Sequence, residues 1–314
     1  MIVARAKTRQ KMIACRLITR HLYIDLSCVV WYDDTIKPKE GKYMDLQTSL
    51  FTDDELLEEE RNQLVVKHNA LIQKTRYSLN TQQQKIILYL ISKIKPDDDD
   101  LQEYDYDLKD FCRVCGIETH GQNYQNIKES ILQLHNKAFW IETEEKDMLV
   151  SWIIKATIYK NDTRLRIRLD DDLKPFLLHL REQFTAYELQ NILVMRSKYS
   201  IRLYEYLKSY CSLGVITISV NELKEILDCV NEYNRWCDFK RRVLDTALQE
   251  INGYTDLQIT TEFTRQNKSI AKVIFTIAKK DSHTATITRI ENTARLKGTY
   301  HEIEERRKAN ANGE

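Results

Sequence analysis

Two arginines and a glutamine share one face of a helix that the hydrophobic pattern predicts over Phe239–Asn252. At about 100° per residue, Arg241, Arg242 and Gln249 lie opposite the apolar positions. Arginine can form paired hydrogen bonds with O6 and N7 of guanine, and glutamine can do so with adenine. The pattern therefore predicts base contacts in a DNA major groove. The alternative is a solvated face on which Asp245 pairs with one of the arginines.

Further polar and cationic residues flank this helix, where contacts to a DNA backbone are expected. Arg265 and Lys268 lie in the polar tip of a predicted hairpin, at the position where a wing contacts phosphates or the minor groove. A solvated loop is the alternative for these two residues. The complete set of predicted DNA-binding residues is Arg241, Arg242, Gln249, Lys240, Arg235, Asn234, Tyr233, Arg265, Lys268, Arg196, Lys198 and Arg202.

The helix predicted over Met195–Tyr210 organises the elements around these residues. Its apolar stripe consists of Leu203, Tyr204, Leu207, Tyr210 and Cys211. Its basic residues are Arg196, Lys198, Arg202 and Lys208. We expect the basic face to be solvated and to add phosphate contacts, and Arg202 has the alternative of pairing with Glu205.

The segments after this helix follow the order of a winged helix. The predicted elements are a strand over Val215–Ser219, a helix over Val220–Leu227 capped by Ser219, a turn over Val230–Asp238, the helix over Phe239–Asn252 ended by Gly253, and strands over Leu257–Phe263 and Ala271–Lys279. A winged helix is a helix-turn-helix variant that places one helix in the major groove.

An earlier part of the chain repeats this order. We expect a helix from the cap Asn80 to Ile94, a strand, two helices ending near Gly116 and Ala138, and three further strands. The outer face of the second helix is barely basic, and the turn Glu144–Asp147 is acidic, which disfavours contact with phosphates. This unit is therefore predicted to be a poor reader of sequence, and its strands are predicted to support self-association.

Two segments carry a resemblance to a known family. SKYSIRLYEYLKSY, followed by DFKRRVLDTALQEIN, resembles the initiator replication (Rep) proteins of iteron plasmids, as does LVVKHNALIQKTRYSLNTQQQKIILYLISKI upstream. The resemblance covers Leu64 to Lys280. It implies monomers that bind repeated origin sites (iterons), open A·T-rich DNA and recruit the host replicative helicase, with the host initiator as a further partner. It also implies dimers, formed through the first domain, that occupy an inverted operator and repress the gene.

The predicted fold class is α+β, with two tandem winged-helix domains. The predicted division is an extension over 1–43, an acidic tether over 44–63, a first winged helix over 64–172 for dimerisation and accessory DNA contact, a second over 173–280 as the main DNA reader, and a charged, partly disordered tail over 281–314. The extension is expected to be disordered or translated upstream sequence, with Met44 as the natural start.

Composition supports the same division. Asp45–Val194 holds 19 Lys and Arg against 27 Asp and Glu, a balance of −8, whereas Met195–Lys280 holds 14 against 10, a balance of +4. The second half therefore suits a nucleic-acid partner better. Seven cysteines without a secretory signal, and no apolar run long enough for a membrane helix, predict a cytoplasmic protein without membrane contact. The resemblance to plasmid initiators implies that this cytoplasm is bacterial.

Catalytic and metal-binding patterns are absent from the sequence. Cys112 and Cys115 near His120 suggest zinc, but no second cysteine pair has the required spacing, so core cysteines are favoured. No His-x-His pair or glycine-rich phosphate loop occurs. We expect no enzyme activity, metal or cofactor. The predicted function is a plasmid replication initiator. The alternatives are a DNA-binding transcriptional regulator without initiator activity and a winged-helix adaptor between proteins.

Overall fold

The computed structural model describes residues 53–95, 98–115, 123–142, 145–160 and 164–311. The first part of the chain forms α2 (Asp53–Arg61), β1 (Leu64–His68), α3 (Asn69–Gln73), α4 (Thr81–Ser92), β2 (Tyr104–Asp107), α5 (Leu108–Val114), α6 (Asn123–His135), β3 (Ala138–Glu142), β4 (Asp147–Ser151), β5 (Ile153–Ile158) and β6 (Arg164–Leu169). The predicted extension over 1–43 lies outside the described residues, and helix α2 forms the end of the predicted tether.

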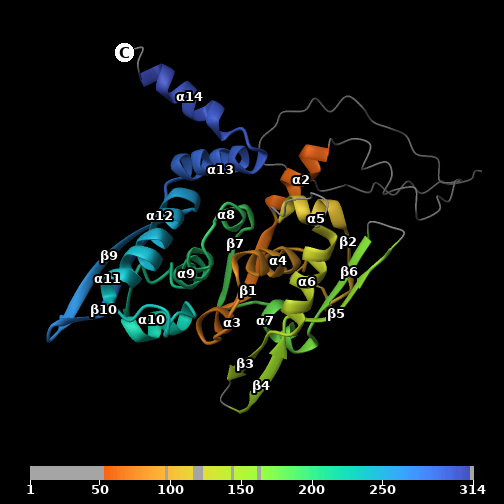
Figure 1. Cartoon of the computed structure of the whole chain (residues 1–314), viewed down its shortest axis with the longest axis horizontal. Coiled ribbons are helices and arrows are strands. Elements are labelled where there is room, and N and C mark those ends of the chain that lie inside the picture. The colour runs from red at the N-terminus through yellow and green to blue at the C-terminus, as the bar shows by residue number, and fades with distance from the viewer. Residues whose placement is uncertain (1–52, 96–97, 116–122, 143–144, 161–163, 312–314) are drawn as a thin grey trace, which may run out of the picture. The chain divides into compact units, whose positions relative to one another are not determined.

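The second part of the chain is dominated by helices and one long hairpin (Figure 1). Its elements are η1 (Asp171–Leu173), α7 (Lys174–Leu177), β7 (Phe184–Glu188), α8 (Gln190–Leu193), α9 (Lys198–Ser209), β8 (Val215–Ser219), α10 (Val220–Ile226), α11 (Trp236–Phe239), the π-helical turn η2 (Lys240–Leu244), α12 (Asp245–Tyr254), β9 (Leu257–Gln266), β10 (Ser269–Lys279), α13 (Ser282–Lys297) and α14 (Tyr300–Ala311).

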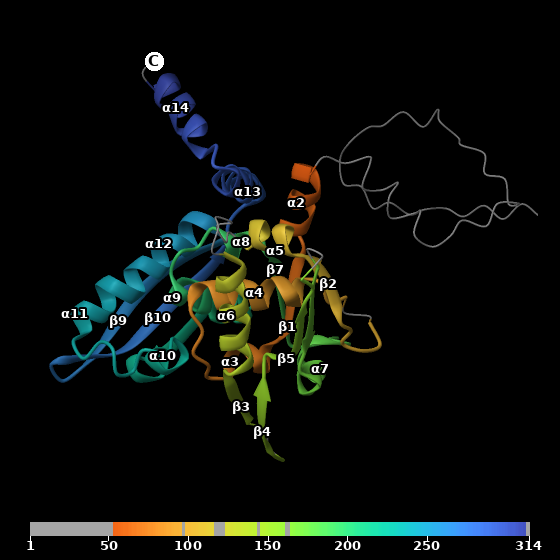
Figure 2. The same cartoon turned by 45° about the vertical axis from the view of Figure 1, so that its right-hand side comes forward.

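Both parts contain the winged-helix order that the sequence predicts. In the first unit α4, β2, α5 and α6 precede the strands β3 to β6, and in the second α9, β8, α10 and α11–α12 precede β9 and β10. The antiparallel sheets have the strand orders β2-β6-β5 and β8-β10-β9. In both views the β9–β10 hairpin lies beside α10 and α12 (Figures 1 and 2). The prediction of an α+β fold with two winged helices is confirmed.

Local sequence signals determine where key helices begin. The Asn80 side chain accepts a hydrogen bond from the backbone of Gln83, and the Gln83 side chain accepts one from the backbone of Asn80. This reciprocal capping box starts α4 as predicted. The Ser219 hydroxyl likewise accepts a bond from the Glu222 backbone at the start of α10. Each cap satisfies an N–H group that a helix would otherwise leave unpaired.

A two-stranded sheet connects segments that the predicted domain boundary at residue 172 would separate. Strand β1 pairs antiparallel with β7, with Val66 opposite Ala186. Strand β7, which follows residue 172, therefore packs on the opening strand of the first winged helix. Within β7, the Thr185 hydroxyl donates to Asn69 Oδ1 at 2.6 Å, which adds a side-chain contact between the two segments.

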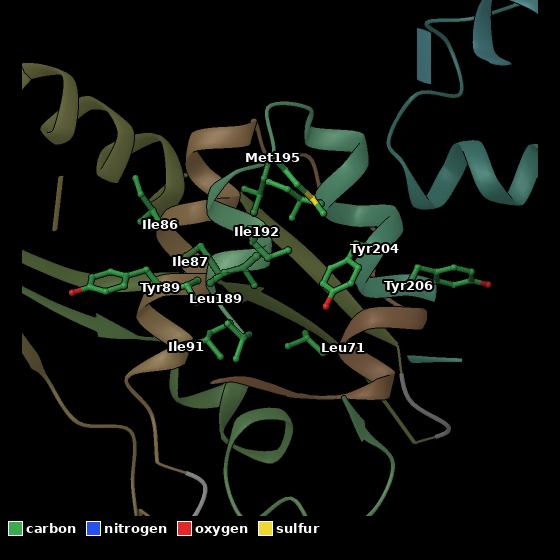
Figure 3. Packing of buried hydrophobic residues seen from close by; sticks show 14 of the residues in the cluster. Leu71, Ile86, Ile87, Tyr89, Ile91, Leu189, Ile192, Met195, Tyr204 and Tyr206 are labelled. Carbon is green, nitrogen blue, oxygen red and sulfur yellow. The ribbon is translucent and has the colours of Figure 1, made fainter. Parts of the chain in front are cut away.

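The core between the two units is built from α4, α8 and α9 (Figure 3). Ile87 of α4 lies beside Leu189 and near Ile192, whereas Ile86 points away from them on the other side of α4. All of these side chains, and that of Met195, are buried. Fully burying a side chain of this size contributes roughly 1.5–3 kcal/mol relative to exposure.

Three predicted element boundaries are wrong. The helix predicted to end at Asn252 continues through Gly253 to Tyr254, and at its end the Thr255 N–H donates to the Ile251 carbonyl. The wing strands extend to Gln266 and restart at Ser269, so the tip is a two-residue turn. Asn267 adopts a φ of 57° there, a left-handed conformation that asparagine tolerates.

The C-terminal tail was predicted to be partly disordered, and this is wrong for residues 282–311, which form α13 and α14. Asp281 caps α13, and the Asn292 side chain, fully buried, donates to the Tyr254 carbonyl at 2.7 Å. Lys297 pairs with Glu58 of α2 at 2.9 Å. Helix α13 therefore contacts both the reading helix of the second unit and the first helix described in the chain.

Candidate nucleic-acid interface

One helical stretch, α11 through α12, presents the residues predicted to read bases. Its inner face consists of Phe239, Val243, Leu244, Ala247 and Ile251, all completely buried. The Asp245 N–H bonds to the Lys240 carbonyl five residues earlier, which defines a π turn. The additional residue in that turn lets two adjacent side chains, Val243 and Leu244, both reach the core. Such turns are frequently found at functional sites.

The outer face of this stretch carries three of the predicted residues in exposed positions. Arg241 is 72% exposed and lies 3.5 Å from Asp238. Arg242 and Gln249 are exposed, and within the described residues neither makes a hydrogen bond or ion pair. On the other side, the Asn252 amide exchanges two hydrogen bonds with the backbone of Ile259, which holds α12 against β9. The face is therefore rigidly supported and open to a ligand.

Acidic side chains form ion pairs with some of the cationic side chains beside this face. Lys240 pairs with Asp245 at 2.6 Å and lies 5.8 Å above the Phe263 ring. Arg235, 79% exposed, lies 4.0 Å from Asp238. Exposed ion pairs of this kind contribute about 0–1 kcal/mol, so a phosphate can displace the carboxylate. These residues can contact DNA, but Lys240 first has to leave Asp245.

A basic hollow of about 740 Å³ opens between α10, the start of α11 and the hairpin β9–β10. Lys224, Arg265, Lys268 and Lys272 line it together with Asn234, and its lining contains no acidic residue within the described part of the chain. Lys224 donates to the Tyr233 carbonyl at 2.6 Å. Four cations without a compensating carboxylate create a site for an anion such as a backbone phosphate.

The sequence prediction missed Lys224 and Lys272 in this hollow. In the register of β10, Lys272 lies opposite Thr264 of β9 and Ser219 of β8, so its position depends on strand pairing. The period-2 alternation of β10 could have identified Lys272 as outward-facing. No local signal marks Lys224, because its helix position meets the wing only in three dimensions.

Arg202 was predicted to contact DNA, and the structure shows that this is wrong. Its side chain is 3% exposed and donates to the Thr75 carbonyl at 2.8 Å and the Tyr77 hydroxyl at 2.9 Å. It also lies 4.3 Å from the Tyr77 ring centroid. Helical periodicity assigned this cation to solvent, but carbonyl oxygens and an aromatic face satisfy it inside the core.

The other basic residues of α9 differ in accessibility. Arg196, just before the helix, is exposed. Lys198 pairs with Glu232 at 3.4 Å, and Lys208 forms an ion pair with Asp256. The predicted solvated basic face is therefore wrong for most of its length, and Arg196 is the most accessible of the three α9-region residues proposed to bind DNA.

Tyr233 has a structural role in addition to its predicted place at the interface. Its ring packs edge-on against Tyr199 with centroids 6.3 Å apart, and the Tyr199 hydroxyl donates to Glu232 at 2.6 Å. The side chain is half-buried, and the loop it anchors positions the exposed Asn234 and Arg235. Tyr233 therefore supports neighbouring contact residues.

Cys112 and Cys115 are both buried in the first unit. Burial raises the pKa of the Cys112 thiol to about 11, which keeps it protonated near neutral pH. A zinc ligand needs the thiolate, so this environment suits core cysteines. His120 lies outside the described residues. Within the described ranges, no group of three or more His, Cys, Asp or Glu side chains could hold a metal, and no helix is long and apolar enough to cross a membrane.

Lys272 offers a direct test of the hollow. Replacing it with glutamine should reduce the slope of log affinity for DNA against log salt by about 0.9, because one phosphate contact is lost. Lys272 is exposed and makes no ion pair within the described residues, so the fold should be unaffected. The matched control is Lys279→Gln, at the other end of the same strand. An equal change in both variants would contradict a local site.

Two winged helices in tandem, one with a cationic reading face, define a class of double winged-helix proteins. Family comparison defines the group more closely: the description "Initiator Replication protein, WH1" matches residues 64–208, and "Initiator Rep protein, WH2" matches residues 219–277. The two matches together cover more than half of the chain. The chain therefore belongs to the Rep initiator proteins of iteron plasmids, as the sequence resemblance predicted.

Individual relatives are distant. An uncharacterised 27.6 kDa protein of Escherichia coli is 23% identical over 207 residues, 61% of this chain and 86% of that protein. A replication initiation protein of Escherichia coli is 24% identical over 134 residues, 41% of each chain. The crystal structure of the Pi initiator protein in complex with iteron DNA matches with a TM-score of 0.56 and 18% identity, over 71% of this chain and 99% of that one. This likeness supports the fold.

Proposed function

We propose that this chain initiates plasmid replication by binding repeated double-stranded DNA sites, iterons, at the plasmid origin. The observation that carries the proposal is the exposed face of α11–α12, with Arg241, Arg242 and Gln249, beside the basic hollow. Membership of the initiator family supports the role in replication, and the iteron complex of the Pi initiator supports the choice of DNA site.

In the proposed complex, α11–α12 enters the major groove and the hollow receives the adjacent backbone. Arg241 and Arg242 contact guanine edges, and Gln249 contacts adenine. Arg265 and Lys268 of the wing, with Lys272, contact phosphates next to that groove. Base contacts supply specificity in this arrangement, and phosphate contacts supply position and salt-dependent affinity.

The first winged helix is proposed to provide self-association and an accessory DNA contact. The β3–β4 hairpin projects from the end of α6 in both views, and it pairs Trp140 with Leu149 (Figures 1 and 2). These side chains are 55% and 57% exposed. Apolar side chains paired on the surface in this way are candidates for contact with a second copy of the chain. We propose that dimers formed through this domain repress the initiator's gene at an operator, while monomers bind the origin repeats.

A substitution on this hairpin tests the dimer. Trp140→Ser should shift sedimentation velocity profiles toward monomer, because the exposed indole is the largest apolar side chain available for self-association there. Leu213→Ser, at a residue that is 67% exposed in the second unit, is the matched control and should leave the profile unchanged. A monomeric wild type at all concentrations would contradict the dimer and the autorepression that depends on it.

Opening of A·T-rich DNA, and recruitment of the host replicative helicase and host initiator, complete the proposed role. The test is whether the chain and the DNA flanking its gene maintain a plasmid that lacks any other origin. We expect maintenance by the wild type. Specific binding without maintenance would indicate a transcriptional regulator. Absence of DNA binding at every salt concentration would indicate an adaptor.

A further inference from the structure

An apolar groove of about 490 Å³ lies between α6 and β5 in the first winged helix, apart from the candidate DNA interface. The buried side chains of Ile131 and Ile153 form its floor. Leu132 and Ile154 stand beside them and are 57% and 39% exposed. Aliphatic side chains with this exposure lose stabilisation unless another apolar surface covers them.

The strand that forms one wall of the groove is an edge strand. The sheet order β2-β6-β5 leaves β5 paired with β6 alone among the described strands. At Ile153, the first residue of β5, the carbonyl oxygen lies 2.8 Å from the His135 Nδ1 atom of α6. This contact closes one end of the exposed strand edge. The backbone over 154–158 therefore offers hydrogen-bonding groups to an additional strand on the side facing away from β6.

The rim of the groove is basic although the first half of the chain is acidic. Lys128, Lys155 and Lys160 line it together with His135, and none of the lining residues that the structure describes is acidic. Lys155 pairs with Glu103 at 2.8 Å and remains 60% exposed. An exposed pair of this kind is weak, so an incoming carboxylate can compete for the ammonium group.

This charge also identifies the class of occupant. In a symmetric dimer built on β5, two copies of the same lysines would approach each other, which is unfavourable for a second copy of the chain. An acidic partner would be attracted instead. In an extended segment, successive side chains point to opposite sides, so one side can place aliphatic groups in the groove while the other carries carboxylates toward the rim.

We propose that this groove binds an extended acidic segment of another protein, in which Asp or Glu alternates with aliphatic residues, by adding a strand to β5. The residues involved are distinct from Arg241, Arg242 and the basic hollow. The proposal therefore stands or fails separately from DNA binding.

The test uses a fluorescein-labelled synthetic peptide of alternating Asp and Val, titrated with the full chain and followed by fluorescence anisotropy. We expect saturable binding, and binding about tenfold weaker when Asn replaces every Asp in the peptide. Ile154→Asp should weaken binding of the Asp peptide by at least about tenfold, because it places a carboxylate on the apolar surface. Lys160→Glu should also weaken it, and Leu213→Asp, at an exposed leucine outside the groove, should not.

Hydrogen exchange provides a second readout that does not depend on a variant. Backbone amides of 154–158 should gain protection when the Asp peptide binds. Absence of saturable binding by the wild type would overturn the proposal, as would equal binding of the Asn peptide or unchanged binding by Ile154→Asp. A loss of self-association by Ile154→Asp, with no peptide binding by the wild type, would instead assign the groove to contact between copies.

Discussion

The double substitution Arg241→Ala and Arg242→Ala should remove the ability to distinguish origin repeats from random DNA while leaving the protein folded. Each paired hydrogen bond between arginine and guanine contributes roughly 1–3 kcal/mol of discrimination, so two such contacts correspond to roughly 2–6 kcal/mol. Both side chains are exposed, and neither supports the buried face of the helix. A salt-titrated binding assay on the DNA flanking the gene measures the effect.

A matched variant separates base contact from general charge. Arg306→Ala removes an exposed arginine on α14, which makes no hydrogen bond or ion pair within the described residues. Its affinity for repeats and random DNA should match the wild type. If the double variant retains full discrimination, α11–α12 is not the reading helix, and the proposed site is wrong even if the protein still binds DNA elsewhere.

Glu205→Gln should be the most destabilising single substitution considered. Glu205 of α9 forms an ion pair with Lys67 of β1, and the side chains of both residues are 1% exposed. The Tyr187 hydroxyl also donates to the Glu205 carboxylate. Burial lowers the pKa of Lys67, and Glu205 is the neighbour that opposes this shift. Removing one member of a buried ion pair lowers the free energy of unfolding by about 3–5 kcal/mol, because the remaining buried charge has no ionic partner.

Urea unfolding of the variant and of a double replacement tests this interpretation. We expect a large fall in the unfolding midpoint for Glu205→Gln, and substantial recovery when Lys67→Met is added. The recovery is expected because the second substitution removes the unpaired ammonium. A midpoint for Glu205→Gln equal to that of the wild type would show that the pair does not hold β1 on α9. Equal loss in the single and double variants would assign the effect to packing.

Helix positions and buried faces were predictable from sequence where periodicity and capping agreed. The spacing of Phe239, Val243 and Ala247 predicted the buried face of the reading helix, and Asn80 and Ser219 marked two helix starts. These signals depend on residues within a few positions of each other. Backbone hydrogen bonds and nearby side chains decide them before any long-range contact forms.

The errors arose where distant segments determine the environment. Arg202 appeared solvent-facing on a helical wheel, but Thr75 and Tyr77, more than a hundred positions earlier, enclose it. Residues 282–311 appeared to be a charged tail, yet α13 finds a partner in Tyr254 through the buried Asn292. Single-sequence periodicity contains no information about such contacts, so the buried arginine and the docked C-terminal helix could be found only from the structure.

The proposed site was predictable in part for the same reason. Arg241, Arg242 and Gln249 follow from a single helix pattern, and the structure exposes all three. The hollow combines Lys224 of α10 with Lys272 of β10, and the closeness of these residues depends on how the wing folds back. Local spacing can therefore predict a reading face, whereas a phosphate site assembled from three elements requires their arrangement.

The π turn over Lys240–Leu244 constrains how this protein can acquire new DNA specificity. Removing one residue there would restore a regular helix and rotate α12 by about 100° relative to α11. That rotation would move Gln249, but it would also move Ala247 and Ile251 out of the core. The packing that buries Ala247 and Ile251 therefore also determines which side chains α12 exposes. Divergence among descendants of this chain should therefore change the chemical identity of exposed side chains and preserve the length of the turn.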